Sequence, residues 1–143
     1  MSENATVLTE AERALYGTRA DVLIPGAEGM PSATQIGTHT YWIDLALAAR
    51  PDLLADFKAS LALGSADDPA AAINEIHSTQ PAVFDAFSVL TSGAYLMCPD
   101  VKALIGYPGQ EPRPVIGDDV PEYFGMLERV VERGPIYRPT VTA

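Results

Sequence analysis

The chain has 143 residues, of which 48% are hydrophobic, and its formal net charge is −10. This length is enough for one domain with a substantial core and short for two. An acidic surface repels phosphate groups, so we expect neither nucleic acid nor an anionic membrane to be a partner.

The cysteine content and the N-terminal sequence indicate in which compartment the protein belongs. The single cysteine, Cys98, cannot form an internal disulfide, and we expect it to be a buried structural thiol. Residues 1–17 contain neither a basic segment followed by an apolar one nor two adjacent arginines. No apolar run approaches the ~20 residues of a membrane-spanning helix. The sequence therefore predicts a soluble, cytoplasmic protein.

Apolar residues recur at intervals of three and four along most of the chain, whereas alternating β-branched runs are nearly absent. This pattern predicts an all-α fold. Thr9 and Glu12 have the spacing of a capping box at the start of a first helix. We expect that helix to end near Ile24, because Pro25 cannot continue it.

A second helix is expected after the turn-rich sequence PGAEGMP. Ser32 is its predicted N-cap, and Gly37 falls inside it. A glycine within a helix costs about 1 kcal/mol relative to alanine, so we interpret Gly37 as a place where another backbone packs closely. The apolar stripe of this helix consists of Ile36, Ile43 and Leu47.

Prolines begin the next helices, which we expect at residues 51–63, 69–78, 81–97 and 99–104. The helix at 81–97 is the most apolar, and its apolar residues cover more than half of its circumference. We therefore place it at the centre of the bundle. A last amphipathic helix is expected at about 121–133, ended by Gly134.

The predicted architecture is an irregular bundle of about six to seven helices in one domain, residues 1–134. Residues 106–120 contain three prolines and form a connection longer than compact domains usually carry. Residues 135–143 are expected to be an extended tail, because a helical bundle offers this segment no strand to pair with. The long connection and the tail indicate a surface that a partner completes.

Candidate catalytic groups do not combine into a recognised site. His39 and His77 have no catalytic or metal partner at helical spacing, and Glu75 does not face His77 on a helix. Neither GAEG nor GYPG matches a phosphate-binding loop. We therefore predict no catalytic, cofactor-binding or metal-binding residue in this chain. A small enzyme or ligand-binding protein that uses His39, Asp44 and Tyr95 remains the alternative.

Two segments are more specific than composition explains: VLIPGAEGMPSATQIGTHTYWID at residues 22–44 and FDAFSVLTSGAYLMCPDVKALIGYPGQ at residues 84–110. Together they resemble the gluconate 2-dehydrogenase subunit 3-like family, which comprises small subunits of flavoprotein dehydrogenases. The resemblance depends on the LIP sequence, the aromatic-Ile-Asp sequence and the closing LIGYPG sequence, in the same order and spacing. It does not extend beyond Gln110.

This resemblance implies a non-catalytic small subunit that binds and stabilises a large FAD-dependent oxidoreductase of the glucose-methanol-choline (GMC) class. The substrate of such a complex is a sugar, a glycoside or a related alcohol, and the FAD belongs to the large subunit. Many exported members begin with a twin-arginine signal, which residues 1–9 lack, so we expect a cytoplasmic complex. A transient assembly chaperone for the same flavoprotein is the second interpretation.

The predicted partner interface combines a turn and the tail. Tyr107, Pro108 and Gly109 suit a type II turn, with Pro108 at i+1 and Gly109 at i+2, which leaves Tyr107 exposed as an anchor. The tail adds an aliphatic, an aromatic and a guanidinium group, and Tyr and Arg are enriched among interface hot spots. The predicted interface residues are Tyr107, Pro108, Ile136, Tyr137 and Arg138.

Overall fold

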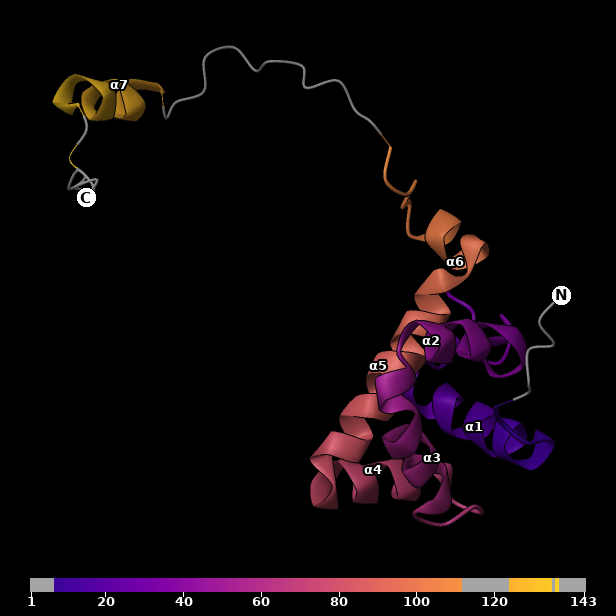
Figure 1. Ribbon diagram of the computed structural model, residues 1–143. Helices are drawn as coiled ribbons and strands as arrows, with labels where there is room; N and C mark the ends of the chain where they lie inside the picture. The colour runs from indigo at the N-terminus through magenta and orange to yellow at the C-terminus, as the bar shows by residue number, and fades with distance from the viewer. Residues whose placement is uncertain (1–6, 112–123, 135, 137–143) are drawn as a thin grey trace, which may run out of the picture. The chain divides into compact units, whose positions relative to one another are not determined.

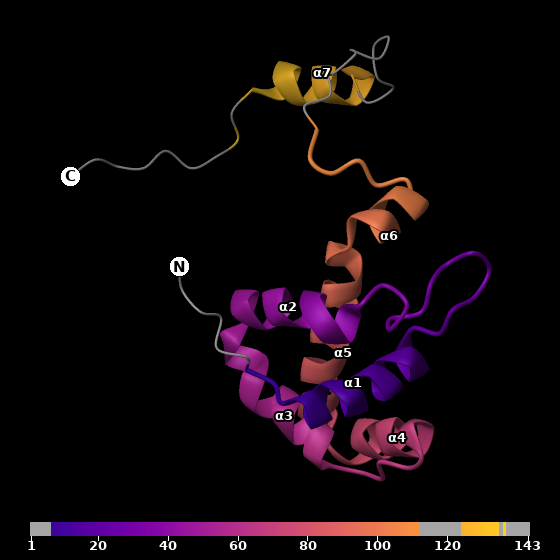
Figure 2. The ribbon, with the colours of Figure 1, turned by 90° about the vertical axis from the view of Figure 1, so that its right-hand side faces the viewer.

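The computed structural model describes residues 7–111, 124–134 and 136. Contacts divide the chain into two compact units, Met1–Gly109 and Gln110–Ala143. Both units are helical (Figures 1 and 2). The described residues form seven α-helices, a π-helical turn and a 3-10 turn, and their only β-type pairing is an isolated bridge between Ala27 and Met30. The predicted all-α class is confirmed.

Helix α1 (Glu10–Leu23) begins at the predicted capping box. The Thr9 N–H donates to Glu12 Oε2 (2.7 Å), and the Glu12 N–H donates to Thr9 Oγ1 (3.2 Å). These bonds satisfy two of the N–H groups that the start of a helix leaves without intrahelical partners. Ile24 is the C-cap and Pro25 follows it, as predicted.

The second predicted helix is shorter than the sequence indicates. Residues 33–37 form a turn, and helical structure begins only with the π-helical turn η1 (Thr38–Trp42), followed by α2 (Ile43–Ala49). Gly37 is the N-cap and has φ +74°, so it lies before the helix. The prediction of a close backbone contact at Gly37 is wrong, because the glycine provides a left-handed conformation there.

The predicted stripe on this helix divides between two apolar clusters. Ile43 and Leu47 are buried in the main core, whereas Ile36 packs in a second cluster. Ile36 lies in the turn before η1, so the helical spacing that joined it to Ile43 does not apply.

The next segments each begin with proline at the predicted positions: η2 (Pro51–Leu53), which runs into α3 (Leu54–Ala62), then α4 (Pro69–Thr79), α5 (Pro81–Met97) and α6 (Pro99–Leu104). The Asp68 carboxylate caps α4 by accepting the Ala71 N–H (2.9 Å). α5 contacts η1, α2, α3, α4 and α6 and is the central helix, as predicted. Figure 2 shows α1 and α2 in front of α5.

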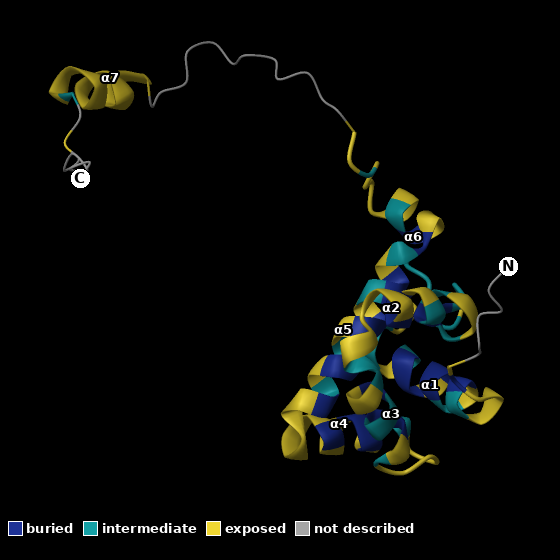
Figure 3. Ribbon diagram, viewed as in Figure 1, coloured by how far each residue is buried: buried dark blue, intermediate teal, exposed yellow. Residues whose placement is uncertain are grey.

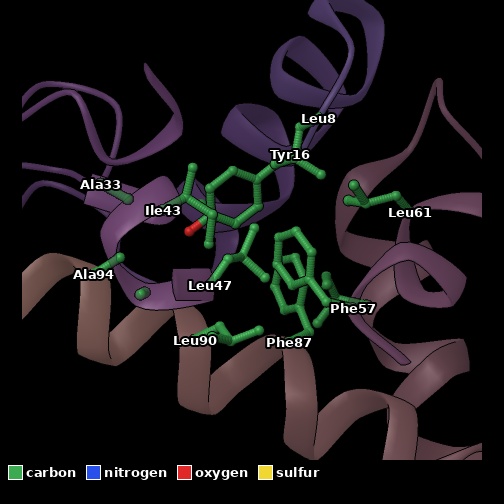
Figure 4. Packing of buried hydrophobic residues seen from close by; sticks show 13 residues of the cluster. Leu8, Tyr16, Ala33, Ile43, Leu47, Phe57, Leu61, Phe87, Leu90 and Ala94 are labelled. Atoms are coloured by element: carbon green, nitrogen blue, oxygen red, sulfur yellow. The ribbon is translucent and has the colours of Figure 1, made fainter. Parts of the chain in front are cut away.

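Three aromatic rings from three helices form the middle of the main core (Figure 4). Tyr16 of α1 meets Phe57 of α3 and Phe87 of α5 edge-on, with ring centroids 5.2 and 5.8 Å apart. Phe57 and Phe87 stack, with centroids 6.0 Å apart. All three side chains are fully buried. This cluster fixes the first helix against the central one.

Arg19 belongs to α1, and its side chain is completely buried. Its guanidinium donates to the Ser60 carbonyl and to the Ser65 carbonyl, the latter at 3.4 Å. The Ser60 carbonyl belongs to the last turn of α3, where carbonyls have no intrahelical donor and a positive charge is favourable. Arg19 therefore joins the C-terminal end of α3 to α1. Burial lowers the pKa of Arg19.

The second unit contains α7 (Phe124–Arg133), within the helix predicted at 121–133. The Gly134 N–H donates to the Val131 carbonyl (3.0 Å), and Gly134 has φ +72°, so the predicted C-terminal end is confirmed. Residues 112–123 of the predicted connection and last helix lie outside the described residues, as does the tail except for Ile136.

Candidate functional site

A Schellman motif closes the C-terminal end of α6. The Gly106 N–H donates to the Ala103 carbonyl (3.1 Å), and the Tyr107 N–H donates to the Lys102 carbonyl (2.8 Å). Gly106 has φ +68°, a left-handed conformation that glycine adopts at little cost. The motif satisfies the last carbonyls of the helix and fixes the direction in which the chain leaves it.

Three large side chains at this end of α6 are exposed. Leu104, Ile105 and Tyr107 expose 56%, 52% and 50% of their surface, and we call these three residues the α6 apolar end. Pro108 follows and is also exposed. Gly109 has φ +89°, which suits position i+2 of a type II turn, but residues 107–109 form no turn and the Gln110 N–H does not donate to the Tyr107 carbonyl, so the type II turn stays a prediction. The prediction that Tyr107 is exposed is confirmed.

The other predicted interface residues belong to the second unit. Ile136 exposes 76% of its surface. Tyr137 and Arg138 lie outside the described residues. A shared surface of these residues with Tyr107 stays a prediction.

A small apolar cluster packs around Val101, on the buried side of α6. Its residues are Tyr95, Cys98, Val101, Ile24, Met30, Ile36 and Trp42. The Tyr95 hydroxyl donates to the Pro31 carbonyl (2.7 Å), and burial, with a smaller contribution from Cys98, raises the pKa of Tyr95. Cys98 is a buried free thiol, as predicted. The α6 apolar end therefore follows a helix whose Val101 is buried in this cluster.

A cavity of about 420 Å³ opens beside η1. Its lining consists of Glu10, Arg13, Ala14, His39, Thr40 and Asp44. Arg13 donates to both carboxylate oxygens of Asp44 (2.8 and 2.9 Å) and to the carbonyls of His39 and Thr40 (3.1 and 3.2 Å). Arg13 thereby fixes the π-helical turn against α1. Sequence reasoning missed this ion pair, because its partners are 31 residues apart.

The alternative enzyme hypothesis named three residues, and the structure brings two of them to this cavity. His39 and Asp44 line it, whereas Tyr95 is not part of its lining. Both oxygens of the Asp44 carboxylate accept hydrogen bonds from the Arg13 guanidinium. His39 Nδ1 is buried and has no hydrogen-bond partner among the described residues. The cavity thus combines a carboxylate that is ion-paired with Arg13 and an imidazole nitrogen that is closed to solvent.

The other histidine lies elsewhere. The His77 ring meets the Phe84 ring edge-on, with centroids 4.7 Å apart, on the exposed side of α4. Within residues 7–111, 124–134 and 136, no three His, Cys, Asp or Glu side chains come together as metal ligands. Among the described helices, none has both the length and the apolar character needed to cross a bilayer.

The two candidate sites differ in what they offer chemically. The α6 apolar end presents aliphatic and aromatic surface on a fixed backbone, which suits binding to a protein. In the cavity beside η1, the two charged groups Arg13 and Asp44 already bind each other. No family model, curated protein or solved structure matches this chain.

Proposed function

We propose that this chain is a non-catalytic subunit that binds and stabilises a large FAD-dependent oxidoreductase of the GMC class, acting on a sugar, a glycoside or a related alcohol. In this proposal the large subunit carries the FAD and the catalytic groups. The observation that carries the proposal is the α6 apolar end, where Leu104, Ile105 and Tyr107 are exposed on a backbone fixed by the Schellman motif.

Exposed apolar groups on a fixed backbone favour association for two reasons. Covering them removes apolar surface from water, which stabilises a complex by about 25 cal/mol per Å². A backbone that is already ordered loses little conformational entropy on binding. Tyrosine adds a hydroxyl that can bond at the edge of an interface. The α6 apolar end combines exposed apolar surface, an ordered backbone and a tyrosine hydroxyl.

The location of the two resembling segments supports the same proposal. Residues 22–44 and 84–110 meet in the cluster behind α6, and the hydrogen bond from the Tyr95 hydroxyl to the Pro31 carbonyl joins them directly. Their packed contact makes one continuous structure that ends in the α6 apolar end. The resemblance to small flavoprotein subunits therefore falls on the part of the chain that positions the candidate interface.

The test is co-expression with the neighbouring long open reading frame whose product carries G-x-G-x-x-G near its start. We expect a complex of this chain with the flavoprotein on size-exclusion chromatography, and a higher yield, flavin content and dye-linked dehydrogenase activity than the flavoprotein shows alone. A complex that persists with FAD fully bound indicates a permanent subunit, and one that dissociates then indicates an assembly chaperone. A flavoprotein that is equally soluble, yellow and active alone contradicts the proposal.

A matched pair of variants tests the surface itself. Tyr107→Ser removes the aromatic anchor of the α6 apolar end, whereas Tyr41→Ser removes a similarly exposed tyrosine from η1. We expect Tyr107→Ser to weaken the complex at least about tenfold, as is usual for an aromatic hot spot, and Tyr41→Ser to leave it nearly unchanged. Thermal unfolding of each isolated variant checks that its fold is intact. Equal effects of the two substitutions would argue against an interface at this end.

A further inference from the structure

Helix α5 is buried on one side and exposed on the other. Its buried side packs against η1, α2, α3, α4 and α6. Exposed residues recur along the other side at intervals of three and four, as Figure 3 shows, and Val89 and Leu96 expose 50% and 48% of their surface. Gly93 lies on the same side, between these two side chains. We call this side the α5 outer stripe, which consists of Ala82, Asp85, Val89, Ser92, Gly93 and Leu96.

The α5 outer stripe carries almost no charge. Asp85 is the only charged residue of α5, although the whole chain has 19 Asp and Glu and 9 Lys and Arg. The solvent-facing side of a surface helix normally carries charged and polar side chains. Exposed apolar side chains in line on an uncharged helix face indicate a surface that another molecule covers.

Gly93 is a second, independent indication of a contact at this surface. A glycine within a helix lowers the stability of the helix relative to alanine. A Cβ at Gly93 would meet no atom within 4 Å, so packing among the described residues gives no reason for a glycine there. Its missing side chain leaves a recess on the stripe, one turn from Val89, where a neighbouring molecule can approach the backbone closely.

The α5 outer stripe is complementary to itself in shape. A two-fold dimer uses the same patch on both copies, so that patch must carry both a protrusion and the recess that receives it. Val89 protrudes and Gly93 is recessed, one turn further along the same stripe. A two-fold axis midway between them places Val89 of each copy over Gly93 of the other. The two α5 helices run antiparallel in this arrangement.

Charge favours the same occupant. Two chains of net charge −10 repel each other, and this repulsion is smallest where they meet through a nearly uncharged face. The antiparallel arrangement separates the two Asp85 carboxylates by about 18 Å along the helices, at ~1.5 Å per residue. This distance exceeds the screening length of about 8 Å at physiological salt. A partner attracted by the acidity of the chain would instead use its many carboxylates, which this face lacks.

We infer that α5 forms the interface of a two-fold dimer of this chain, in which the outer stripes of two copies pack antiparallel and Val89 of each copy enters the recess at Gly93 of the other. A single pair of helices is a small interface, so the dimer is expected to be reversible, with a dissociation constant in the micromolar range. This inference goes beyond the proposed function and does not depend on it.

Sedimentation equilibrium of the isolated full-length chain, from low to high micromolar concentration, measures the dimer. Val89→Glu places two like charges beside the two-fold axis, and Val22→Glu makes the same change at an exposed valine of α1. We expect Val89→Glu to weaken the dimer at least about tenfold and Val22→Glu to leave the dissociation constant within about twofold of wild type. Circular dichroism checks that both variants are folded.

Gly93→Ala separates an effect on the interface from an effect on the fold. The added methyl group fills the recess, so we expect the dimer to be weakened at least about fivefold. Alanine also favours the helix, so the melting temperature should rise at a concentration where the chain is monomeric. Damage to the fold would lower the melting temperature instead. An unchanged dissociation constant in this variant would contradict the arrangement.

Salt and Asp85 test the geometry of the dimer. High salt should strengthen the dimer, because the contact is apolar and the net charge of the chain opposes it. Asp85→Asn should leave the dissociation constant within about twofold of wild type, since the two carboxylates are far apart. A much stronger dimer of Asp85→Asn would show that the helices are parallel, which contradicts the inference.

A wild-type chain that stays monomeric throughout this concentration range overturns the inference. Binding of wild type, but not of Val89→Glu, to the flavoprotein would then assign the α5 outer stripe to that protein. A lower melting temperature of monomeric Val89→Glu than of Val22→Glu would assign the stripe to a contact within the chain. A wild-type dimer that Val89→Glu does not weaken would also overturn the inference, because its interface lies elsewhere.

Discussion

Tyr16 carries its hydroxyl into the main core. The oxygen is buried and has no hydrogen-bond partner among the described residues, and the Thr91 hydroxyl donates to the Phe87 carbonyl (2.7 Å). Burial disfavours the phenolate and raises the pKa of Tyr16 far above its ordinary value of about 10. Ionisation of this side chain is therefore coupled to unfolding.

Stability is predicted to fall at alkaline pH because of Tyr16. Above about pH 10 an unfolded Tyr16 loses its proton and the folded one keeps it, so the unfolded state binds fewer protons and becomes favoured. The contribution is fully present below about pH 10 and decreases by up to about 1.4 kcal/mol per pH unit above it. Urea unfolding of wild type and Tyr16→Phe between about pH 9 and pH 11 measures it.

The phenylalanine variant should show a shallower loss of stability, though not a flat one, because burial also raises the pKa of Tyr95. Parallel curves for wild type and Tyr16→Phe would show that Tyr16 does not remain protonated in the folded state at these pH values.

At the scale of elements, two glycines set the positions of helix ends. Gly37 (φ +74°) precedes η1, and a Cβ at this position lies 3.1 Å from Thr40 Oγ1. Gly64 (φ +71°) follows α3, and its Cβ would lie 2.7 Å from Ala72 Cβ in α4. Gly64 therefore combines a left-handed backbone with a contact that no side chain can occupy.

The loss of folding stability on substitution by alanine should increase from Gly93 through Gly37 to Gly64. Gly37→Ala is expected to cost about 1–2 kcal/mol through the left-handed backbone. Gly64→Ala should cost more, because the α3–α4 turn must also move. Gly93 lies within α5 with nothing within 4 Å of its Cβ position, so Gly93→Ala should stabilise by about 0.5–1 kcal/mol. Chemical denaturation of the three variants checks the order, and a harmless Gly64→Ala would contradict it.

At the scale of the whole molecule, both apolar clusters lie within residues 8–101. The first unit therefore contains its own core, and α6 with its Schellman motif completes it at Gly109. None of the second unit's described residues (110–111, 124–134 and 136) belongs to either cluster.

A chain that ends at Gly109 is predicted to fold alone. Its melting temperature should lie within a few degrees of that of the full chain, because it retains every residue of the two apolar clusters found among the described residues. Circular dichroism at increasing temperature measures the midpoint, with helicity per residue as the second readout. A truncated chain that is unfolded or much less stable would show that residues 110–143 take part in the core.

The local elements were largely predictable from the sequence. Proline at N1 fixed the starts of α4, α5 and α6, and the capping box fixed the start of α1, because these signals act within three or four residues. The exposure of Tyr107 was predicted correctly as well. Ile36 was assigned wrongly, because a left-handed glycine after it interrupts the helical period.

The buried arginines show what only the tertiary structure decides. Arg13 binds Asp44 and two carbonyls of η1, and Arg19 reaches carbonyls 41 and 46 residues further along the chain. Neither pairing has a period or motif, since each depends on how α1 lies against distant segments. The sequence by itself determined the starts of α1, α4, α5 and α6, the central position of α5 and the exposure of Tyr107. Packing alone decided the π-helical turn beside Arg13 and the burial of Arg19, because both require acceptors that long-range contacts bring together.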